Sequence, residues 1–376
     1  MWQRLRYIII KEFIQAVRDP RLRIFILLPP IIQLLTYGYA INFDYRQIAM
    51  AVWDEAQTAQ SREFIKRFSQ NDYFRLAYYI QSQQEMNDLI DRNKITLALH
   101  IPYDFSRNLA TGKRTPVQLI LDGTDSNAAL ITSRFANTII FDYAVEVLAR
   151  RLNRLGVGEQ SSGQLYVEER TWFNPNRISS TSFIPGVVAM VVMLVSLQLT
   201  ALAIVREKEI GTLEQLLVSP IRPLELMLGK TIPFVIISLL DVLLVTIIAI
   251  FWFEVPFRGN PLVLLLATIL FLFCTVGGGL FISTISATQQ QAMMISVFFF
   301  MPAILLSGLV FPIHNMPWLA QLVTYINPLT YFIVVAQDVF LKGVGLAVLW
   351  PELLAMGALG CALLTLSVLR FHKRLA

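Results

Sequence analysis

The sequence has few residues of the kinds that build metal, disulfide or histidine-centred catalytic sites. Its 376 residues include two cysteines and three histidines. Cys274 and Cys361 both lie in long apolar runs, where they form no disulfide framework and have no zinc-ligand spacing. His100, His314 and His372 are scattered along the chain. We therefore expect no metal site and no catalytic nucleophile–base set.

A nucleotide-binding motif is also missing. Leu228-Gly229-Lys230-Thr231 looks like the end of a phosphate-binding loop, but that pattern needs a glycine five residues before its Gly-Lys pair, where this chain has Leu224. No other ATPase signature occurs in the sequence. We therefore expect that the chain is not an enzyme and binds no cofactor itself, and that any ATP and Mg²⁺ would be bound by a separate subunit.

Charged residues are scarce as well. They make up 15% of the chain against 55% hydrophobic residues, and the mean hydropathy of +0.58 is too high for a soluble domain of this size. Six apolar runs could each cross the roughly 30 Å of bilayer hydrocarbon. They are Ile24–Ile41, Phe183–Val205, Thr231–Phe253, Pro261–Ile285, Ala292–Val310 and Leu346–Leu369. The sequence therefore predicts six transmembrane helices.

The distribution of basic residues predicts the orientation of these helices. Three segments, before the first run, between the second and third, and after the sixth, hold 13 of the 31 basic residues against 6 acidic ones. Because basic residues are retained on the cytoplasmic side, both termini and the segment between the second and third runs are expected there. We read the basic pI of about 9.2 as a consequence of this topology and expect no nucleic-acid partner.

Residues 44–180 differ in composition from the rest of the chain. They hold 16 basic and 16 acidic residues and no spanning run, which predicts a water-soluble domain outside the membrane between helices 1 and 2. Alternating β-rich and amphipathic stretches favour an α/β fold with a parallel or mixed sheet. The expected strands are Ile48–Trp53, Phe74–Ile80, Thr96–Ile101, Val117–Leu121 and Leu165–Trp172, and the expected helices are Ser61–Ser69, Gln83–Arg92, Tyr103–Ala110 and Asn127–Leu155. The sequence leaves open whether this domain holds a binding cleft or is a docking surface.

The charged insert between the second and third runs, residues 206–230, is the most informative segment. Ile210, Leu213 and Leu217 recur at helical spacing until Pro220 and Pro223 end the pattern. This predicts a short helix at the cytoplasmic membrane surface. It would either couple the membrane helices to a partner or simply hold two spans apart.

This insert resembles the first cytoplasmic loop of ABC transporter permeases of the type-2 exporter class. The matching residues are Arg206, Glu207, Glu209, Gly211, Thr212, Glu214, Leu216, Leu217 and Pro220. In that family the segment is the coupling helix, which docks into a cleft of the ATPase subunit. The resemblance extends over the whole chain and includes the large external domain of the bacterial multidrug branch.

The resemblance implies further expectations about partners and substrates. The chain would be a permease subunit in the bacterial cytoplasmic (inner) membrane, paired with an identical or related second permease subunit and with an ABC ATPase subunit. A periplasmic adaptor is a further candidate partner. The exported compounds would be hydrophobic or amphipathic, such as drug-like molecules or lipids. The resemblance also implies that the amphipathic start of the chain is a surface elbow helix.

The segment Phe311–Gly345 is apolar but broken by prolines. Two short helices are expected, one from Pro317 and one from Pro328, with Asn327 as the N-cap of the second. Neither is long enough to cross the membrane, so a re-entrant pair buried against the spans is the expected arrangement. The resemblance implies such a pair at this place.

Two candidate residues for the transport pathway lie inside the apolar runs. Asp241 is near the middle of the third run, where a charged aspartate costs about 2.5–3.5 kcal/mol on insertion scales. It would either line the pathway or form a structural hydrogen bond with a neighbouring helix. Met301 lies in a bulky, adaptable stretch of the fifth run that would suit an apolar substrate or simple packing. Gly277–Gly279 in the fourth run is expected to allow close helix packing.

The combined prediction is an α-helical membrane protein with six transmembrane helices and an α/β extracytoplasmic domain between helices 1 and 2. Its segments are 1–43 (interfacial helix and helix 1), 44–180 (α/β domain) and 181–376 (helices 2–6 with the coupling helix and re-entrant pair). The alternative from another class is a membrane sensor or assembly protein with an external ligand-binding domain.

Overall fold

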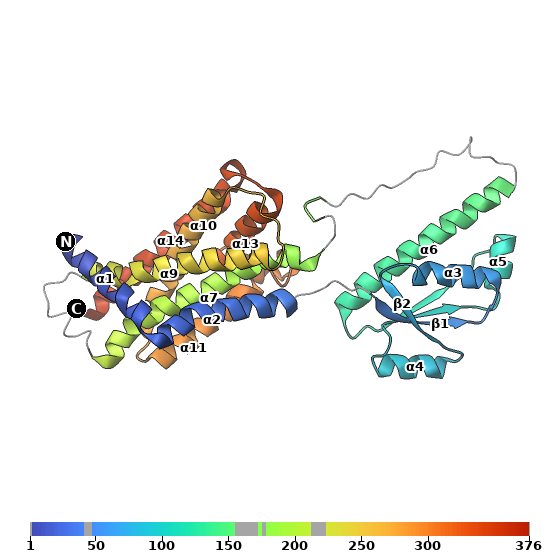
Figure 1. Cartoon of the computed structure of the whole chain (residues 1–376), viewed down its shortest axis with the longest axis horizontal. Helices are drawn as coiled ribbons and strands as arrows, with labels where there is room; N and C mark the ends of the chain where they lie inside the picture. Colours follow the sequence, from blue (N-terminus) through green and yellow to red (C-terminus); the bar gives the residue numbers. More distant parts are fainter. Residues whose placement is uncertain (1, 41–46, 155–171, 175–177, 212–222, 376) are drawn as a thin grey trace. The chain divides into compact units, whose positions relative to one another are not determined.

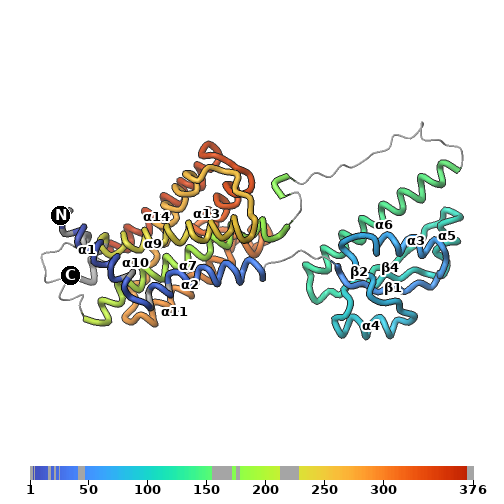
Figure 2. Tube along the Cα trace, viewed as in Figure 1, coloured from blue at the N-terminus to red at the C-terminus, as the bar shows by residue number. Residues whose placement is uncertain are grey.

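The computed structural model describes residues 2–40, 47–154, 172–174, 178–211 and 223–375 (Figures 1 and 2). The chain divides into two compact units, which are described separately. Met1–Asn42 and Arg170–Ala376 form one, here called the helical unit, and Phe43–Glu169 form the other, the α/β unit.

Within its described part, the α/β unit contains a four-stranded mixed sheet. The strands are β1 (Ile48–Asp54), β2 (Phe74–Tyr79), β3 (Leu97–Ile101) and β4 (Gln118–Leu121), in the spatial order β2-β1-β3-β4. Its helices are α3 (Ala59–Ser69), α4 (Gln83–Asp91), α5 (Phe105–Thr111) and α6 (Ser126–Arg154). Strand β1 is parallel to β2 and β3, while β4 is antiparallel to β3, which confirms the predicted α/β pattern and mixed sheet. The fifth expected strand, Leu165–Trp172, lies outside the described residues except for Trp172.

Different helices cover the two faces of this sheet. Parallel strands need crossover connections, and the two crossovers here, α3 and α4, lie on opposite faces (Figure 1). Val52 and Leu99 point toward α3, α5 and α6 and pack with Phe64. Ala51 and Ala98, one residue out of phase, point toward α4. This alternation buries both faces of the central strands.

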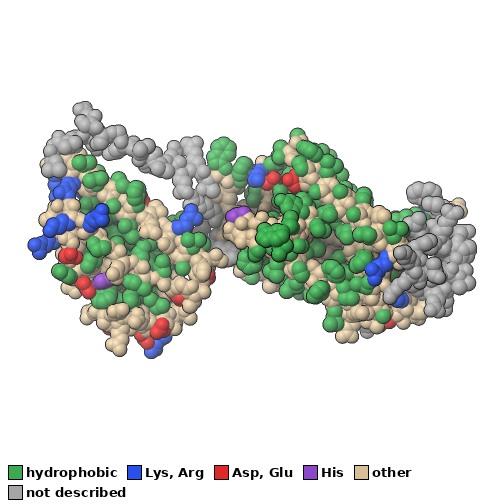
Figure 3. Space-filling model, turned by 180° about the vertical axis from the view of Figure 1, so that it is seen from behind, with side chains coloured by type: hydrophobic (Ala, Val, Ile, Leu, Met, Phe, Trp, Pro, Cys, Tyr) green, Lys and Arg blue, Asp and Glu red, His purple; other side chains and the backbone are tan. Residues whose placement is uncertain are grey.

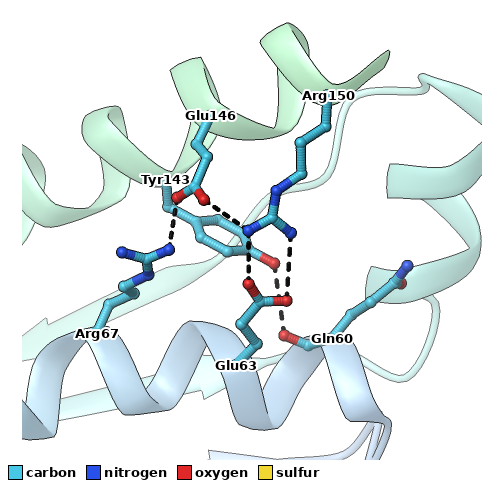
Figure 4. A network of polar contacts seen from close by, with 6 residues as sticks. All are labelled: Gln60, Glu63, Arg67, Tyr143, Glu146 and Arg150. Carbon is cyan, nitrogen blue, oxygen red and sulfur yellow. Dashed lines mark hydrogen bonds and ion pairs between the residues drawn. The ribbon is translucent and has the colours of Figure 1, made fainter. Parts of the chain in front are cut away.

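A network of charged side chains joins α3 to α6 on the surface of this unit (Figure 4). Arg150 binds Glu63 at 2.8 Å and Glu146 at 2.5 Å, and Arg67 binds Glu146 at 2.6 Å. The hydrogen bond from Arg150 lowers the pKa of Glu63, and the carboxylates raise the pKa of Arg150. All four side chains are well exposed, so the network orients α6 on α3 more than it stabilises the fold.

The helical unit is built around one buried helix, α7. Its elements are α1 (Trp2–Arg18), α2 (Pro20–Ala40), α7 (Ser179–Ile210), α9 (Pro223–Phe251), α10 (Pro261–Ile285), α11 (Gln289–Leu305), α12 (Trp318–Thr324), α13 (Pro328–Gln337) and α14 (Leu346–Leu375). Helix α7 packs against α2, α9, α10, α11 and α13. It is the most buried of the candidate spans, consistent with a sequence that is apolar on all sides.

The three consecutive glycines of α10 allow this close packing. A Cβ atom at Gly279 would lie 2.8 Å from the backbone oxygen of Leu197 in α7, and one at Gly277 would lie 3.0 Å from the backbone nitrogen of Leu364 in α14. The helix continues through all three glycines. The predicted packing role of Gly277–Gly279 is therefore confirmed.

Four described helices are long and apolar enough to cross a membrane, and the bent pair α12 and α13 could raise the number to five. The helices are α7, the Leu228–Phe251 part of α9, α10, and the Leu346–Arg370 part of α14. Two of the six predicted spans correspond to shorter apolar helices, Ile26–Ala40 and Gln289–Leu305. Helix α11 ends before the predicted Val310 because the chain turns at Gly308, which has a φ of +86°. Apolar side chains cover much of the visible face of the helical unit (Figure 3).

The structure confirms the two short helices predicted after the fifth run. Helices α12 and α13 meet at an angle of 75°. The side chain of Asn327 accepts a hydrogen bond from the backbone N–H of Leu329, and Pro328 occupies the first turn, as predicted for an N-cap. Asn327 also donates to the carbonyl oxygen of Ala303 at 2.7 Å, which fixes the bend to α11. Pro317 is the N-cap residue of α12.

Candidate functional site: a charged junction at the end of α7

Four consecutive charged residues end α7, and each contacts a different part of the helical unit. With their partners they form a cluster that we call the charged junction: Glu12, Asp19, Arg206, Glu207, Lys208, Glu209, Lys230, Ser286 and Gln289. The guanidinium of Arg206 lies 3.5 Å from Asp19, which connects α1 to α2. The carboxylate of Glu207 lies 2.9 Å from the ammonium of Lys230 in α9.

The other two residues connect α7 to the region between α10 and α11. Lys208 donates a hydrogen bond of 2.6 Å to the carbonyl oxygen of Ser286, the residue that caps the end of α10. Glu209 accepts hydrogen bonds from the backbone nitrogen of Gln289 at 3.1 Å and from its side-chain nitrogen at 2.9 Å. Adjacent residues at the end of α7 therefore contact the α1–α2 connection, α9, the C-cap of α10 and the start of α11.

The most buried part of the junction is an ammonium ion between two carboxylates. The Lys230 side chain is 3% exposed, and the side chains of Glu12 and Glu207 are 7% and 14% exposed. Lys230 lies 3.0 Å from Glu12 and 2.9 Å from Glu207, so both carboxylates share one cation. Such a group is stable only while its members stay paired, because an unpaired buried charge is costly. The arrangement holds α1, α7 and α9 at fixed positions relative to one another.

Helix α7 stops directly after the junction. Gly211 has a φ of +81°, the left-handed conformation common at the end of a helix. Arg206, Glu207, Glu209 and Gly211 of the predicted coupling motif therefore lie at the end of α7. The other predicted residues of the motif, Thr212, Glu214, Leu216, Leu217 and Pro220, lie outside the described residues.

The sequence reasoning missed Glu12 and Lys230 as members of this site. In the sequence, Lys230 belongs to a failed phosphate-loop match and to the charged insert, and Glu12 lies in the amphipathic segment expected at the membrane surface. Glu12 is seven residues after Leu5, so the two share one face of α1, and both are buried. A carboxylate in register with an apolar face was the signal that could have identified a buried ion pair.

Asp241 is buried in α9 and one of its oxygens has no partner among the described residues. The residue is 3% exposed, and Oδ2 makes no hydrogen bond there. The hydroxyls of Thr200 in α7 and Thr246 in α9 are likewise buried without a described partner. The expected bond from this oxygen to a neighbouring helix is not observed. This oxygen of Asp241 is thus not compensated by a hydrogen bond within the described part of the chain.

The second pathway candidate does not share the surroundings of Asp241. Met301 lies on α11 and is 56% exposed, next to other exposed apolar side chains such as Phe298. A further acidic residue, Glu352 in α14, was missed by the sequence reasoning, although it lies within the sixth predicted run. Its Oε2 is buried and has no partner among the described residues.

Replacing Lys230 with methionine should destabilise the protein strongly. The change leaves Glu12 and Glu207 facing each other without their cation, and breaking a buried ion pair from one side costs about 3–5 kcal/mol. Thermal unfolding in detergent should show a large drop in Tm. Lys11→Met is the matched control, because Lys11 also lies 3.3 Å from Glu12 but its side chain is 59% exposed. Equal melting of the two variants would contradict a structural role for the buried group.

Comparison with known proteins identifies the family. Residues 20–369 match the family described as "ABC-2 family transporter protein". The chain is 35% identical over 353 residues, 94% of each chain, to the "Probable multidrug ABC transporter permease YbhR" of Escherichia coli strain K12. It is 32% identical over 376 residues, 100% of this chain and 98% of the relative, to the "Probable multidrug ABC transporter permease YbhS" of the same organism. It is 30% identical over 296 residues, 77% and 76% of the two chains, to the "Inner membrane transport permease YhhJ".

These matches cover almost the whole chain, and they agree with the apolar helices and with the charged motif at the end of α7. They favour a transport subunit over the alternative of a membrane sensor. A permease of this family acts with an ATPase partner and a paired permease. The chain belongs to the ABC-2 family of transporter proteins, as a multi-pass membrane permease.

Proposed function

We propose that this chain is the permease subunit of an ATP-driven exporter that moves hydrophobic or amphipathic compounds out of the cytoplasm or the inner leaflet. The observation that carries the proposal is the charged junction, which connects the start of the insert to α1, α9, α10 and α11. A force applied to the insert would reach all these helices through adjacent residues. This is the requirement for a coupling element.

The insert, residues 206–230, would bind the ATPase subunit. Glu214 would supply charge for a cleft in that partner, and Leu216 and Leu217 an apolar anchor. ATP and Mg²⁺ bound by the partner would draw two ATPase subunits together, and the coupled motion would switch the permease pair between inward and outward states. Because the buried Lys230 pairs with both Glu12 and Glu207, the parts of α1, α7 and α9 at the charged junction would move together.

The membrane arrangement proposed here has six spans, with both termini and the insert in the cytoplasm. The two shorter apolar helices, Ile26–Ala40 and Gln289–Leu305, would complete the set. The bent pair α12 and α13 would be re-entrant, and the α/β unit would lie on the outer side. The excess of basic residues in the three proposed inner segments supports this orientation.

The substrates proposed are drug-like compounds or lipids, because relatives of this chain are named as multidrug permeases. A second permease subunit, identical or related, would complete the pathway. The α/β unit would meet a periplasmic adaptor or a ligand. The exposed apolar side chains of α11, including Met301, would contact the second permease subunit or the substrate.

Replacing Glu214 and Leu217 together with alanine should uncouple transport. The double variant removes a charge and an apolar anchor from the proposed ATPase contact without altering any junction residue. Transport should fall at least tenfold, the equivalent of about 1.4 kcal/mol, and ATPase co-purification should decrease. Gln215→Ala, in the same segment, is the control and should remain active. Full transport and ATPase binding in the double variant would refute the coupling role.

Cysteines at Gln60 and Asp125, placed in a variant without Cys361, should react with a membrane-impermeant thiol reagent in spheroplasts. Both positions belong to the α/β unit, which is proposed to lie outside. A cysteine at Gln215 should react only after the membrane is opened. Labelling of Gln215 alone in closed spheroplasts would reverse the proposed orientation.

Asp241→Leu should raise the Tm in detergent and lower transport. The aspartate is buried with an unpaired oxygen, so an apolar replacement removes an uncompensated polar group, but a pathway role would be lost with it. Asp241→Asn, which keeps the shape and a polar atom, should retain more transport than the leucine variant. A lower Tm with unchanged transport in Asp241→Leu would instead identify a structural hydrogen bond.

A further inference from the structure

An apolar groove follows the junction of α10 and α14. The two helices pack side by side (Figure 1), and the groove between them has a volume of about 490 Å³. Leu266 and Leu270 line it from α10, and Leu346, Trp350, Gly357 and Cys361 are among the lining residues of α14. No charged side chain lines it.

The lining residues extend along α14 over a length that suits an extended hydrocarbon chain. From Leu346 to Cys361 the helix advances fifteen residues, or about 22 Å, which exceeds the roughly 15 Å of one leaflet of bilayer hydrocarbon. Gly357 keeps the floor open, because a Cβ atom there would meet only Leu270, at 3.8 Å. Trp350 is largely exposed near the start of α14, the place where tryptophan commonly marks a membrane interface.

Two basic residues lie at one end of this groove, where both lining helices begin. Arg258 precedes α10 by three residues, and Lys342 precedes α14 by four. Backbone hydrogen bonds from Arg258 to Phe340 at 3.0 Å and from Gly259 to Val339 at 2.9 Å hold the two segments together. The backbone therefore holds the segments that carry Arg258 and Lys342 next to each other.

The two basic side chains at this end differ in their pairing within the described residues. Lys342 pairs with Asp338 at 2.6 Å, whereas Arg258 forms no ion pair there, including with Glu254. The buried acid of α14, Glu352, is one residue before Leu353 and two after Trp350, so it lies on the face of the helix away from the groove. The two acidic residues here, Glu254 and Asp338, equal the two basic ones in number, and Arg258 is the exposed cation that remains available to an anion near the mouth of the groove.

From this arrangement we propose that the α10–α14 groove binds one anionic phospholipid. An acyl chain would lie along the groove, and the phosphate would accept hydrogen bonds from Arg258 and Lys342 at its mouth. The bound lipid would fill the space between α10 and α14. The inference rests on the proposed function only in taking α10 and α14 as membrane spans. It holds for either orientation of their first residues in the membrane and for any transported substrate.

Native mass spectrometry of the full-length chain, in the assembly in which it purifies, tests this directly. The detergent-solubilised protein is titrated with phosphatidylglycerol and, separately, with phosphatidylcholine of the same acyl chains. Wild-type protein should retain one phosphatidylglycerol per chain in preference to phosphatidylcholine. The occupied groove should also protect Cys361 from an apolar thiol reagent, while the buried Cys274 serves as the unreactive reference.

Two variants separate the head-group contact from the groove. Arg258→Gln with Lys342→Gln should weaken phosphatidylglycerol binding roughly tenfold or more, because each basic residue near an anionic surface contributes about a fivefold factor. Gly357→Phe should block the groove and abolish Cys361 protection. If that variant fails to fold, Ala358→Phe fills the same space. Lys113→Gln with Arg114→Gln removes two exposed charges from the α/β unit and should leave lipid binding unchanged.

Three outcomes would overturn the proposal. Equal binding of phosphatidylglycerol and phosphatidylcholine by wild-type protein would show that no site for an anionic head group exists. Unchanged phosphatidylglycerol binding in both groove-filling variants would show that the lipid is held by surface charge alone. Spontaneous disulfide formation between Cys361 residues of two chains would show that a second copy of the chain covers the groove.

Discussion

The relative positions of α1, α7 and α9 depend on the two ion pairs of the buried Lys230 ammonium. Apolar helices in a bilayer gain little from apolar contact with one another, because lipid tails are as apolar as their side chains. Their relative positions are therefore set by close packing and by polar contacts. Here one lysine holds a carboxylate from α1 and another from α7, and so fixes three helices that are far apart in sequence.

The other residues at the end of α7 extend this constraint. Arg206, Lys208 and Glu209 reach Asp19, Ser286 and Gln289, in three further places of the helical unit. Gly211 thus lies at a point where several of the surrounding helices are already connected. A short charged sequence can in this way contact several helices of the bundle at once.

Much of the fold could be predicted because it follows from periodicity and composition. The strands and helices of the α/β unit alternate in pattern, and the N-cap of α13 follows from Asn327-Pro328. The number of spans was harder to predict from the sequence. A hydropathy pattern does not show a turn such as that at Gly308, and α11 ends before the apolar run does. The ion pairs of the junction could not be derived either. Glu12 and Lys230 are 218 residues apart, and only the packing of α1 on α9 brings them together.

The polar groups at the end of α7 and those in the interior of the helical unit differ in how they are paired. At the end of α7 each charged side chain has a partner, and the resulting contacts resist separation of the helices. In the interior, Asp241, Thr200 and Thr246 have buried oxygens without a described partner. Groups of this kind are satisfied by water, a ligand or another helix. The helices are therefore joined by paired charges at the end of α7, whereas the described polar groups in the middle of the unit add no such contacts between helices.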